Sequence, residues 1–276
     1  MSTKTLQLLD SMVKQMEFIN ILDNGDFTNP VNQRGFVSGD TIANGKYFID
    51  RWRAYNGDVQ PKMIGDGISF ASGTIAQTLL KSNFIGKPIT AVMWCADGVK
   101  VVKSGIVPES ADWSNVINVS SDVNGAQIVV TNTNDKLLVR VISNGVVIKH
   151  VALYDGEYTL AAMPAYRTRG YVNELLECKR YFRVISGVNL VGLSTTSTAT
   201  FSILLDVPMR IAPTVNIVNY GKIKVNGQEA TPVDYRVVAQ TVSGITIVVD
   251  HERLSNAANH TTCLTRDAKI ELSADF

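Results

Sequence analysis

A long succession of short apolar segments is the feature that most constrains the fold of this chain. Between residues 47 and 154 such segments recur at close spacing, and residues 136–142 are an example that alternates between core-facing and outward positions. Polar turns separate the segments, and Asn144-Gly145 between two apolar runs is typical of a β-hairpin. Many short strands without intervening helices predict an antiparallel β-sandwich or barrel.

The alternation stops within residues 158–183, where the spacing of apolar residues becomes helical. Residues 171–183 place Leu175, Cys178 and Phe182 on one side of a predicted helix, with charged residues elsewhere. After this stretch the β-pattern resumes. The chain is therefore predicted to contain two β-rich modules joined by a helix.

The domain boundaries follow from these changes of pattern. A chain of 276 residues suits two domains, since domains usually have roughly 100–200 residues. In the second half, Ser243-Gly244 between two apolar runs predicts another hairpin. We expect an N-terminal helix at residues 1–19, a β module at 20–157, a linker and connecting helix at 158–184, and a smaller β domain at 185–276.

The predicted N-terminal helix carries an apolar stripe. Leu6, Leu9, Val13 and Met16 are three, four and three residues apart, which is the a/d spacing of a coiled coil. Two heptads are fewer than the about three or four that establish a coiled coil. The stripe therefore has two interpretations, packing on the helix's own domain or association with other copies of the chain.

The charge balance and the apolar runs argue against several classes of partner. The formal net charge is +1, so no global field attracts nucleic acid or an acidic membrane. The apolar runs are shorter than the roughly 20 residues that span a bilayer, and residues 1–15 lack the pattern of a secretory signal. Cys95, Cys178 and Cys263 form no CxxC motif and are expected to be buried, reduced thiols. We expect neither nucleic acid nor a membrane as a partner.

The sequence contains no catalytic motif that we can identify. It has no GxSxG, HExxH or Walker A pattern. His251 and His260 lie near Asp250, Glu252 and Cys263, but zinc sites use shorter, fixed spacings, so a solvated loop is the preferred interpretation. A glycosidase needs two carboxylates across a cleft, and the sequence does not pair any of its carboxylates in this way. We predict that the chain is not an enzyme, with a polysaccharide depolymerase as the alternative.

A group of turn residues raises the question of a bound metal. Asp23, Asn24 and Asp26 offer oxygens to calcium, but the full EF-hand spacing is absent. An Asx-type turn, in which such side chains bond to nearby backbone amides, is the simpler interpretation. We expect no cofactor, and a structural calcium ion is the alternative.

Aromatic residues in the first half indicate a possible binding surface. In β-sandwich modules, exposed Trp and Tyr rings stack on the apolar face of a sugar. Trp52 and Trp94 lie in alternating or apolar strands and are expected to be buried. Trp113 follows a polar loop and, together with Tyr47 and Tyr55, is a candidate for ligand binding.

Four passages, spaced over nearly the whole chain, carry a resemblance to a known family. They are NILDNGDF with PVNQRG in residues 20–35, YFIDRW in 47–52, YVNELLECKRYF in 171–182 and VPMRIAPTV in 207–215. Together they resemble the phage tail-fibre and receptor-binding proteins. The resemblance implies an N-terminal jelly roll of carbohydrate-binding-module type, a connecting helix and a small C-terminal β domain. It also implies homotrimers on a virion that attach to a host surface.

The predicted fold is therefore mainly β, with an N-terminal helix, a jelly-roll β-sandwich, a connecting helix and a second, smaller β-sandwich. The predicted function is that of a virion tail-fibre protein, made in the host cytoplasm, which binds host surface polysaccharide and contacts other tail or baseplate proteins. The alternative is a structural protein of the tail, baseplate or head surface that uses the jelly roll for protein–protein assembly. In a homotrimer, the candidate packing residues are Leu6, Leu9, Val13, Met16, Leu175 and Phe182.

Overall fold

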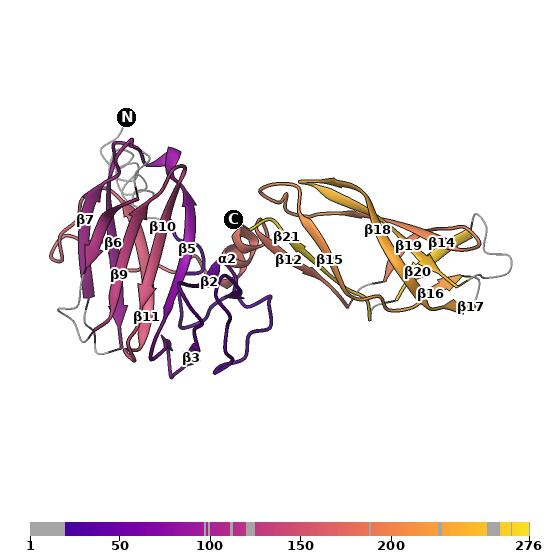
Figure 1. The fold of residues 1–276 in the computed structure, drawn as a ribbon, viewed down its shortest axis with the longest axis horizontal. Helices are drawn as coiled ribbons and strands as arrows, with labels where there is room; N and C mark the ends of the chain where they lie inside the picture. Colours follow the sequence, from indigo (N-terminus) through magenta and orange to yellow (C-terminus); the bar gives the residue numbers. More distant parts are fainter. Residues whose placement is uncertain are drawn as a thin grey trace, which may run out of the picture. The chain divides into compact units, whose positions relative to one another are not determined.

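The computed structural model describes residues 20–275 except 97, 99, 111–112, 120–124, 188, 226–227, 253–259 and 266. The chain divides into two compact units, one that ends at Glu174 and one that begins at Leu175. Strands dominate both units (Figure 1), so the predicted mainly β class is confirmed. The predicted helix at residues 1–19, with Leu6, Leu9, Val13 and Met16, lies outside the described residues.

Two antiparallel sheets form the first unit. The six-stranded sheet has the order β1-β2-β5-β10-β9-β8, and the five-stranded sheet has the order β3-β4-β11-β6-β7. A short 3-10 helix, η1 (Lys81–Asn83), follows β5. The strands are β1 (Tyr47–Ile49), β2 (Trp52–Tyr55), β3 (Lys62–Met63), β4 (Ile68–Ser69), β5 (Thr74–Leu80), β6 (Pro88–Cys95), β7 (Lys100–Ile106), β8 (Ser114–Val119), β9 (Gln127–Asn132), β10 (Lys136–Ile142) and β11 (Ile148–Asp155).

The alternation of side chains along β10 explains how this unit forms its core. Leu137, Val139 and Val141 are buried in one cluster, while Leu138 and Arg140 point to the opposite side of the sheet. Side chains from β6 and β11 of the five-stranded sheet belong to the same cluster. The two sheets therefore bury their inner faces against each other, as in a β-sandwich.

The Asn144-Gly145 turn connects two different sheets, so the predicted hairpin at this position is wrong. Both residues have positive φ angles, 48° and 86°, as the dipeptide favours. However, β10 before the turn pairs with β5 and β9, whereas β11 after it pairs with β4 and β6. The chain crosses between the sheets here because both strands have an apolar face to bury in the shared core.

The segment after β11 covers the outer face of the five-stranded sheet. Tyr158, Met163 and Tyr166 pack against a second cluster that contains Trp94 and Tyr154. Trp94 is buried, as predicted, but beneath this segment and not between the two sheets. Burial also raises the pKa of Tyr154 to about 12. The residues before the helix are therefore a structural part of the first unit.

Helix α2 (Tyr171–Cys178) is shorter than the predicted helix of residues 171–183. Phe182 begins a strand instead, β12 (Phe182–Ile185), which pairs with β21 (Lys269–Ser273). Aromatic and β-branched side chains favour a strand at this position, and a partner strand far along the chain supplies the backbone hydrogen bonds. Local helical periodicity cannot reveal such a partner.

Because α2 ends before Phe182, the predicted helical stripe of Leu175, Cys178 and Phe182 is interrupted. Leu175 and Cys178 lie on α2, where Cys178 is fully buried and Leu175 is half-buried. Phe182 is buried in β12 and does not lie on the helix with them. The prediction that Phe182 extends the helical stripe of Leu175 and Cys178 is therefore wrong.

The second unit also consists of two antiparallel sheets around one core. A three-stranded sheet has the order β12-β21-β15, and a seven-stranded sheet has the order β17-β16-β20-β13-β14-β19-β18. The remaining strands are β13 (Leu190–Ser194), β14 (Thr198–Leu204), β15 (Thr214–Asn219), β16 (Ile223–Val225), β17 (Gln228–Ala230), β18 (Pro232–Thr241), β19 (Gly244–His251) and β20 (His260–Leu264).

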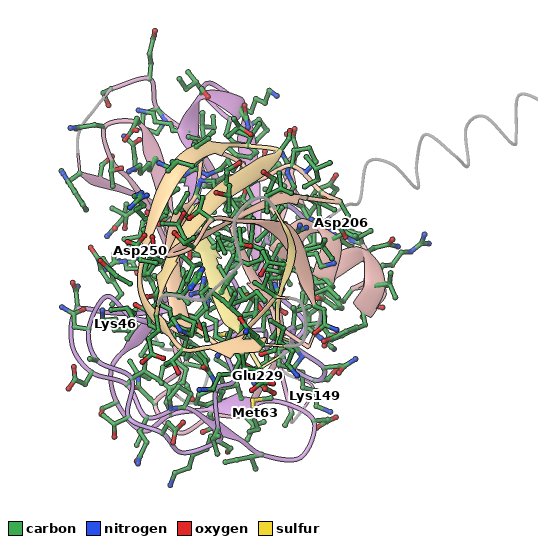
Figure 2. All side chains as sticks on the ribbon, turned by 90° about the vertical axis from the view of Figure 1, so that its right-hand side faces the viewer. Lys46, Met63, Lys149, Asp206, Glu229 and Asp250 are labelled. Carbon is green, nitrogen blue, oxygen red and sulfur yellow. The ribbon has the colours of Figure 1, made fainter. Side chains whose placement is uncertain are left out.

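The predicted hairpin at Ser243-Gly244 is confirmed. Thr241 of β18 and Gly244 of β19 are register partners at its closed end. On the outer side of this hairpin, Nη1 of Arg236 lies 3.3 Å from Oδ2 of Asp250, whose position Figure 2 shows. Both strands thus alternate between a core face and a charged or polar outer face.

Candidate functional site

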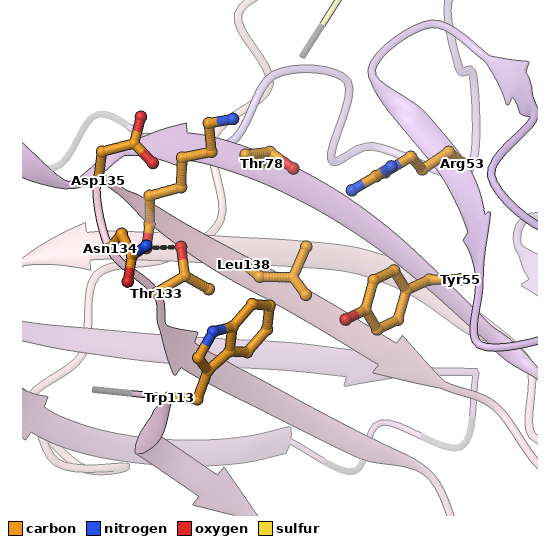
Figure 3. Close-up of a pocket in the computed structure, with 9 residues that line it drawn as sticks. Arg53, Tyr55, Thr78, Trp113, Thr133, Asn134, Asp135 and Leu138 are labelled. Carbon is orange, nitrogen blue, oxygen red and sulfur yellow. Dashed lines mark hydrogen bonds between the residues drawn. The ribbon is translucent and has the colours of Figure 1, made fainter. Parts of the chain in front are cut away.

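An open groove of about 280 Å³ lies on the outer face of the six-stranded sheet of the first unit (Figure 3). It is formed by parts of β2, β5 and β10, by the residue before β8, and by the turn between β9 and β10. The lining residues are Arg53, Tyr55, Thr78, Trp113, Thr133, Asn134, Asp135, Lys136 and Leu138.

The floor of the groove comes from outward-facing residues of two neighbouring strands. Thr78 of β5 and Leu138 of β10 are register partners, and both are almost completely buried. Leu138 supplies an apolar surface, and Figure 3 shows it between the rings of Trp113 and Tyr55. The Thr78 hydroxyl has no hydrogen-bond partner among the residues that the structure describes. The floor thus combines an apolar patch with one unpaired polar group.

Two of the three predicted binding residues meet in this groove. Trp113 is 69% exposed, as the prediction of an exposed ring requires. Tyr55 is half-buried at the end of β2 and lines the same groove. Tyr47 does not line it, and its ring instead faces the guanidinium of Arg34, with Cζ 4.5 Å from the ring centroid. The structure therefore places Trp113 and Tyr55 together and Tyr47 elsewhere.

Arg53 is a groove residue that the sequence analysis missed. Its Cζ atom lies 5.7 Å from the centroid of the Tyr55 ring, within the range of a cation–π contact. The signal for it was present in the sequence. Along β2, Trp52 and Ala54 are buried while Arg53 and Tyr55 are half-exposed, so the two outward residues share one face.

Two buried side chains, Lys81 and Asn132, donate hydrogen bonds to Glu109 and Ser110, which come shortly before Trp113 in the chain. Lys81 is 2% exposed, and its Nζ donates to the carbonyl oxygens of Glu109, at 3.0 Å, and of Ser110. Nδ2 of Asn132 also donates to the Ser110 carbonyl, at 2.8 Å. These bonds fix the loop against β9 and η1. They thereby set the position from which Trp113 reaches the groove.

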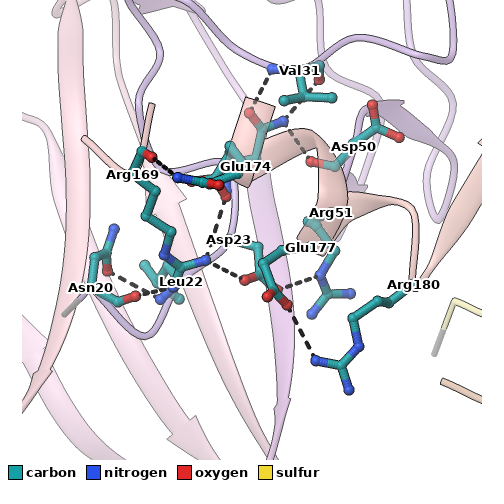
Figure 4. A network of polar contacts seen from close by, with 12 residues as sticks. Asn20, Leu22, Asp23, Val31, Asp50, Arg51, Arg169, Glu174, Glu177 and Arg180 are labelled. Atoms are coloured by element: carbon teal, nitrogen blue, oxygen red, sulfur yellow. Dashed lines mark hydrogen bonds and ion pairs between the residues drawn. The ribbon is translucent and has the colours of Figure 1, made fainter. Parts of the chain in front are cut away.

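A second polar site surrounds the turn that begins the first unit (Figure 4). Oδ1 of Asp23 accepts a hydrogen bond from Nη1 of Arg169 at 2.8 Å, and Oδ2 accepts one from Nε of Arg51 at 3.1 Å. The backbone N–H of Asn24 donates to the carboxylate of Glu174 at the start of α2. The turn, the segment before α2 and the first turn of this helix are thus joined by buried ion pairs and hydrogen bonds.

The predicted calcium alternative does not match this arrangement. The Asn24 side chain accepts from the Val31 N–H and donates to two backbone carbonyls. Asp26 accepts from the N–H and hydroxyl of Thr28, and His150 Nδ1 lies 3.2 Å from its Oδ1. With Asp23 bound to two guanidinium groups, the three side chains face different partners and form no oxygen cluster for calcium. They act as turn and ion-pair residues.

The remaining candidate positions are the cysteines and two histidines, of which the structure describes only some side chains. Cys95 and Cys178 are buried, as predicted, whereas the side chain of Cys263 lies outside the described residues. Nδ1 of His251 lies 2.7 Å from the carbonyl oxygen of Glu252, and the side chain of His260 is not described. Within the described part of the chain, no three His, Cys, Asp or Glu side chains come together as a metal site.

Comparisons with known proteins leave the family open. No protein-family model matches the chain, and no curated protein or solved structure gives a significant match. Among the described residues, no helix has the length and apolar character needed to cross a membrane. The groove of Trp113, Tyr55 and Arg53 is accordingly the site on which a function can be argued.

Proposed function

We propose that this chain is a phage virion protein that attaches to host cell-surface glycan through the groove of Trp113 and Tyr55. The observation that carries the proposal is the placement of these two rings on either side of Leu138 (Figure 3). The resemblance of four passages to phage tail-fibre and receptor-binding proteins supports the virion setting. In such a virion the protein would be made in the host cytoplasm and would contact other tail or baseplate proteins.

The chemistry of the groove suits a sugar. A pyranose ring has an apolar face, which stacks on Trp and Tyr rings, and hydroxyl groups at its edge, which need hydrogen-bond partners. Trp113 supplies an exposed ring, and Asn134 and Asp135 supply amide and carboxylate groups at the same groove. A small apolar floor with polar groups at its margins is the composition expected of such a site.

We further propose that the first unit is a jelly roll. The chain passes from β5 in the six-stranded sheet to β6 and β7 in the five-stranded sheet, returns for β8 to β10, and ends with β11 in the five-stranded sheet. β5 pairs with β10, and β6 pairs with β11. Long connections between two facing sheets are a feature of jelly-roll folds and support this topology.

Binding to an array of host glycans tests the proposed function. The full chain should be displayed multivalently, because linked weak sites gain avidity without new contacts. Trp113→Ala and Tyr55→Ala should each weaken binding by about tenfold or more, as expected when an aromatic hot spot is truncated. Tyr171→Ala, at an exposed tyrosine outside the groove, is the matched control and should bind normally. No binding to any host glycan under multivalent display would refute the proposal.

We also propose a homotrimer, on the basis of the stripe of Leu6, Leu9, Val13 and Met16 and of the family resemblance. Leu175 on α2 is a further candidate for packing between chains. Light scattering should give a mass near three times that of the 30.1 kDa chain. A mass near that of one chain at working concentration would refute the trimer and leave glycan binding to be judged on its own.

A structural virion protein is the second candidate, and one observation favours it. Val191 and Leu193, on a strand inside the seven-stranded sheet, are 65% and 66% exposed. Exposed apolar residues of this kind suit protein–protein assembly. Electron microscopy of the virion separates the candidates, because a distal, solvent-facing position favours attachment and an enclosed position favours assembly. Incubation with host polysaccharide tests a depolymerase, which would shorten the polymer.

A further inference from the structure

The outer face of the six-stranded sheet carries two arginines for which the described residues supply no carboxylate partner. Within the described part of the chain, Arg53 contacts the Tyr55 ring and forms no ion pair. Arg140 donates from Nη2 to Oγ1 of Thr131, at 2.9 Å, and likewise forms no ion pair among the described residues. This differs from Arg51 and Arg169 of the same unit, which both bind Asp23.

The register of the strands places the two arginines on either side of β5. Arg53 of β2 and Arg140 of β10 are both register partners of Ala76, which lies on β5 between them. Their Cα atoms are thus separated by two strand spacings, or about 10 Å. The Arg140 guanidinium extends away from Arg53, toward Thr131 of β9 and Asn115 of β8, and Arg140 does not line the groove. Arg53 is therefore the arginine that a ligand in the groove meets.

The charged residues that line the groove lie at its two ends. Figure 3 shows Arg53 and Tyr55 at one end and Asp135 and Asn134 at the other, with Thr78 and Leu138 between them. The carboxylate of Asp135 is therefore placed away from Arg53. A ligand that lies along the groove meets the Arg53 guanidinium at one end. At the other end it meets the Asn134 amide, the Asp135 carboxylate and the Lys136 side chain.

We infer that the glycan bound in this groove is acidic and carries a carboxylate on the ring that stacks near Arg53. The guanidinium group presents paired N–H donors in a planar fork, which matches the two oxygens of a carboxylate. The Tyr55 ring beneath Arg53 helps to orient that fork. The buried hydroxyl of Thr78, which lacks a partner among the described residues, gives the ligand one further polar contact at the floor. This inference rests on the proposed glycan-binding function, which it narrows to uronate-type sugars.

The test compares three ligands on the full chain. They are an oligosaccharide that contains hexuronate residues, the same oligosaccharide after its carboxyls are reduced to alcohols, and a polymer of glycerol phosphate. We expect the hexuronate oligosaccharide to bind at least about tenfold more tightly than its reduced form, which lacks only the charge-assisted hydrogen bonds. Raising the salt concentration should weaken only the binding of the charged ligands, because salt screens exposed charges.

Arginine variants connect this preference to the groove. Arg53→Gln should lose the preference for the hexuronate ligand and keep the weaker binding of the reduced form. Arg53→Lys should retain part of the preference, since it keeps the charge but not the planar fork. Arg167→Gln, at an exposed arginine of the same unit, is the matched control and should behave like the parent protein. Circular dichroism of each variant verifies that it is folded.

The possible results separate this inference from the proposed function. Equal binding of the hexuronate and reduced ligands would overturn the acidic ligand and leave glycan binding intact. Tighter binding of glycerol phosphate would overturn the carboxylate in favour of a phosphate. An equal effect of Arg167→Gln and Arg53→Gln would show a general charge effect and overturn the site. Absence of binding to all ligands, under multivalent display, would overturn both proposals.

Discussion

Nη1 of Arg169 lies 2.8 Å from Oδ1 of Asp23, which is 146 residues earlier in the chain. The contact joins the segment before α2 to the turn that opens the first unit. Arg51 binds the other oxygen of the same carboxylate, and its side chain is 1% exposed. One carboxylate therefore binds two guanidinium groups, and Oε1 of Glu174 also lies 3.7 Å from Nη1 of Arg169. Loss of the Asp23 charge would leave an excess of positive charge in this buried site.

Asp23→Asn should strongly destabilise the first unit. Removal of one partner from a buried ion pair costs about 3–5 kcal/mol, because the remaining charge stays desolvated. Urea unfolding followed by tryptophan fluorescence measures this unit selectively, since Trp52, Trp94 and Trp113 all belong to it. Asp155→Asn is the matched control, because the ion pair of Asp155 with Lys87 is more than half exposed, and it should cost less than about 1 kcal/mol. Equal losses in the two variants would contradict the prediction.

The pH dependence of stability should reveal the ionised carboxyl of Asp26. Burial opposes its ionisation, but the His150 imidazole and the N–H and hydroxyl of Thr28 outweigh burial and lower the pKa of Asp26 below its ordinary value of 3.8. Because the pKa is lowered in the folded state, the ionised form stabilises the fold. This contribution is complete above the unfolded pKa and is lost as the pH falls through the folded pKa.

The free energy of unfolding of the parent protein should therefore fall relative to that of Asp26→Asn once the pH drops below about 4. Urea unfolding of both proteins at a series of pH values from neutral to strongly acidic measures this difference. A difference that stays constant over the whole range would show that Asp26 does not contribute through its charge.

Local periodicity was sufficient to predict the class of this fold but not the pairing of its strands. Period-two alternation correctly places Trp52 inside, because successive side chains of a strand point to opposite faces. Asn144-Gly145 adopts the backbone angles of a tight turn, yet β10 and β11 belong to different sheets. Phe182 follows a helical spacing but joins β21 in a sheet. In both cases a distant partner strand decides the outcome.

The groove, too, could be predicted from local periodicity only in part. The pairing of Arg53 with Tyr55 on one face is predictable, since the two residues are two positions apart in a strand. Their proximity to Trp113 is not, because it depends on the order β2-β5-β10-β9-β8 across the sheet. The role of Lys81 in holding the loop before Trp113 was also hidden, because a lysine at a strand end is normally exposed.

Lys81→Met should loosen this loop. The substitution keeps most of the side-chain volume but removes the ammonium that donates to the Glu109 and Ser110 carbonyls. Hydrogen bonds from a charged donor contribute about 1.5–3 kcal/mol each, so the unfolding free energy should fall by roughly that much. Glycan affinity should also fall, because the loop positions Trp113.

Lys103→Met is the matched control for this change. Its Nζ also donates to a backbone carbonyl, that of Asn118, but the side chain is exposed, so the loss should be within about 0.5 kcal/mol. Urea unfolding and glycan binding should be measured on both variants. A Lys81 variant as stable and as tightly binding as the Lys103 variant would show that the buried ammonium does not hold the loop.

Iodide quenching of tryptophan fluorescence should report on Trp113 alone. Iodide is a charged quencher that reaches exposed rings, and Trp113 is exposed whereas Trp52 and Trp94 are buried. Trp113→Phe should therefore remove nearly all quenching, while Trp94→Phe should leave it unchanged. A bound glycan should protect the ring from iodide in the parent protein, because a sugar stacked on the indole covers its exposed face. Strong quenching that persists in Trp113→Phe would contradict this burial pattern, and a bound glycan that gives no protection would place binding outside the groove.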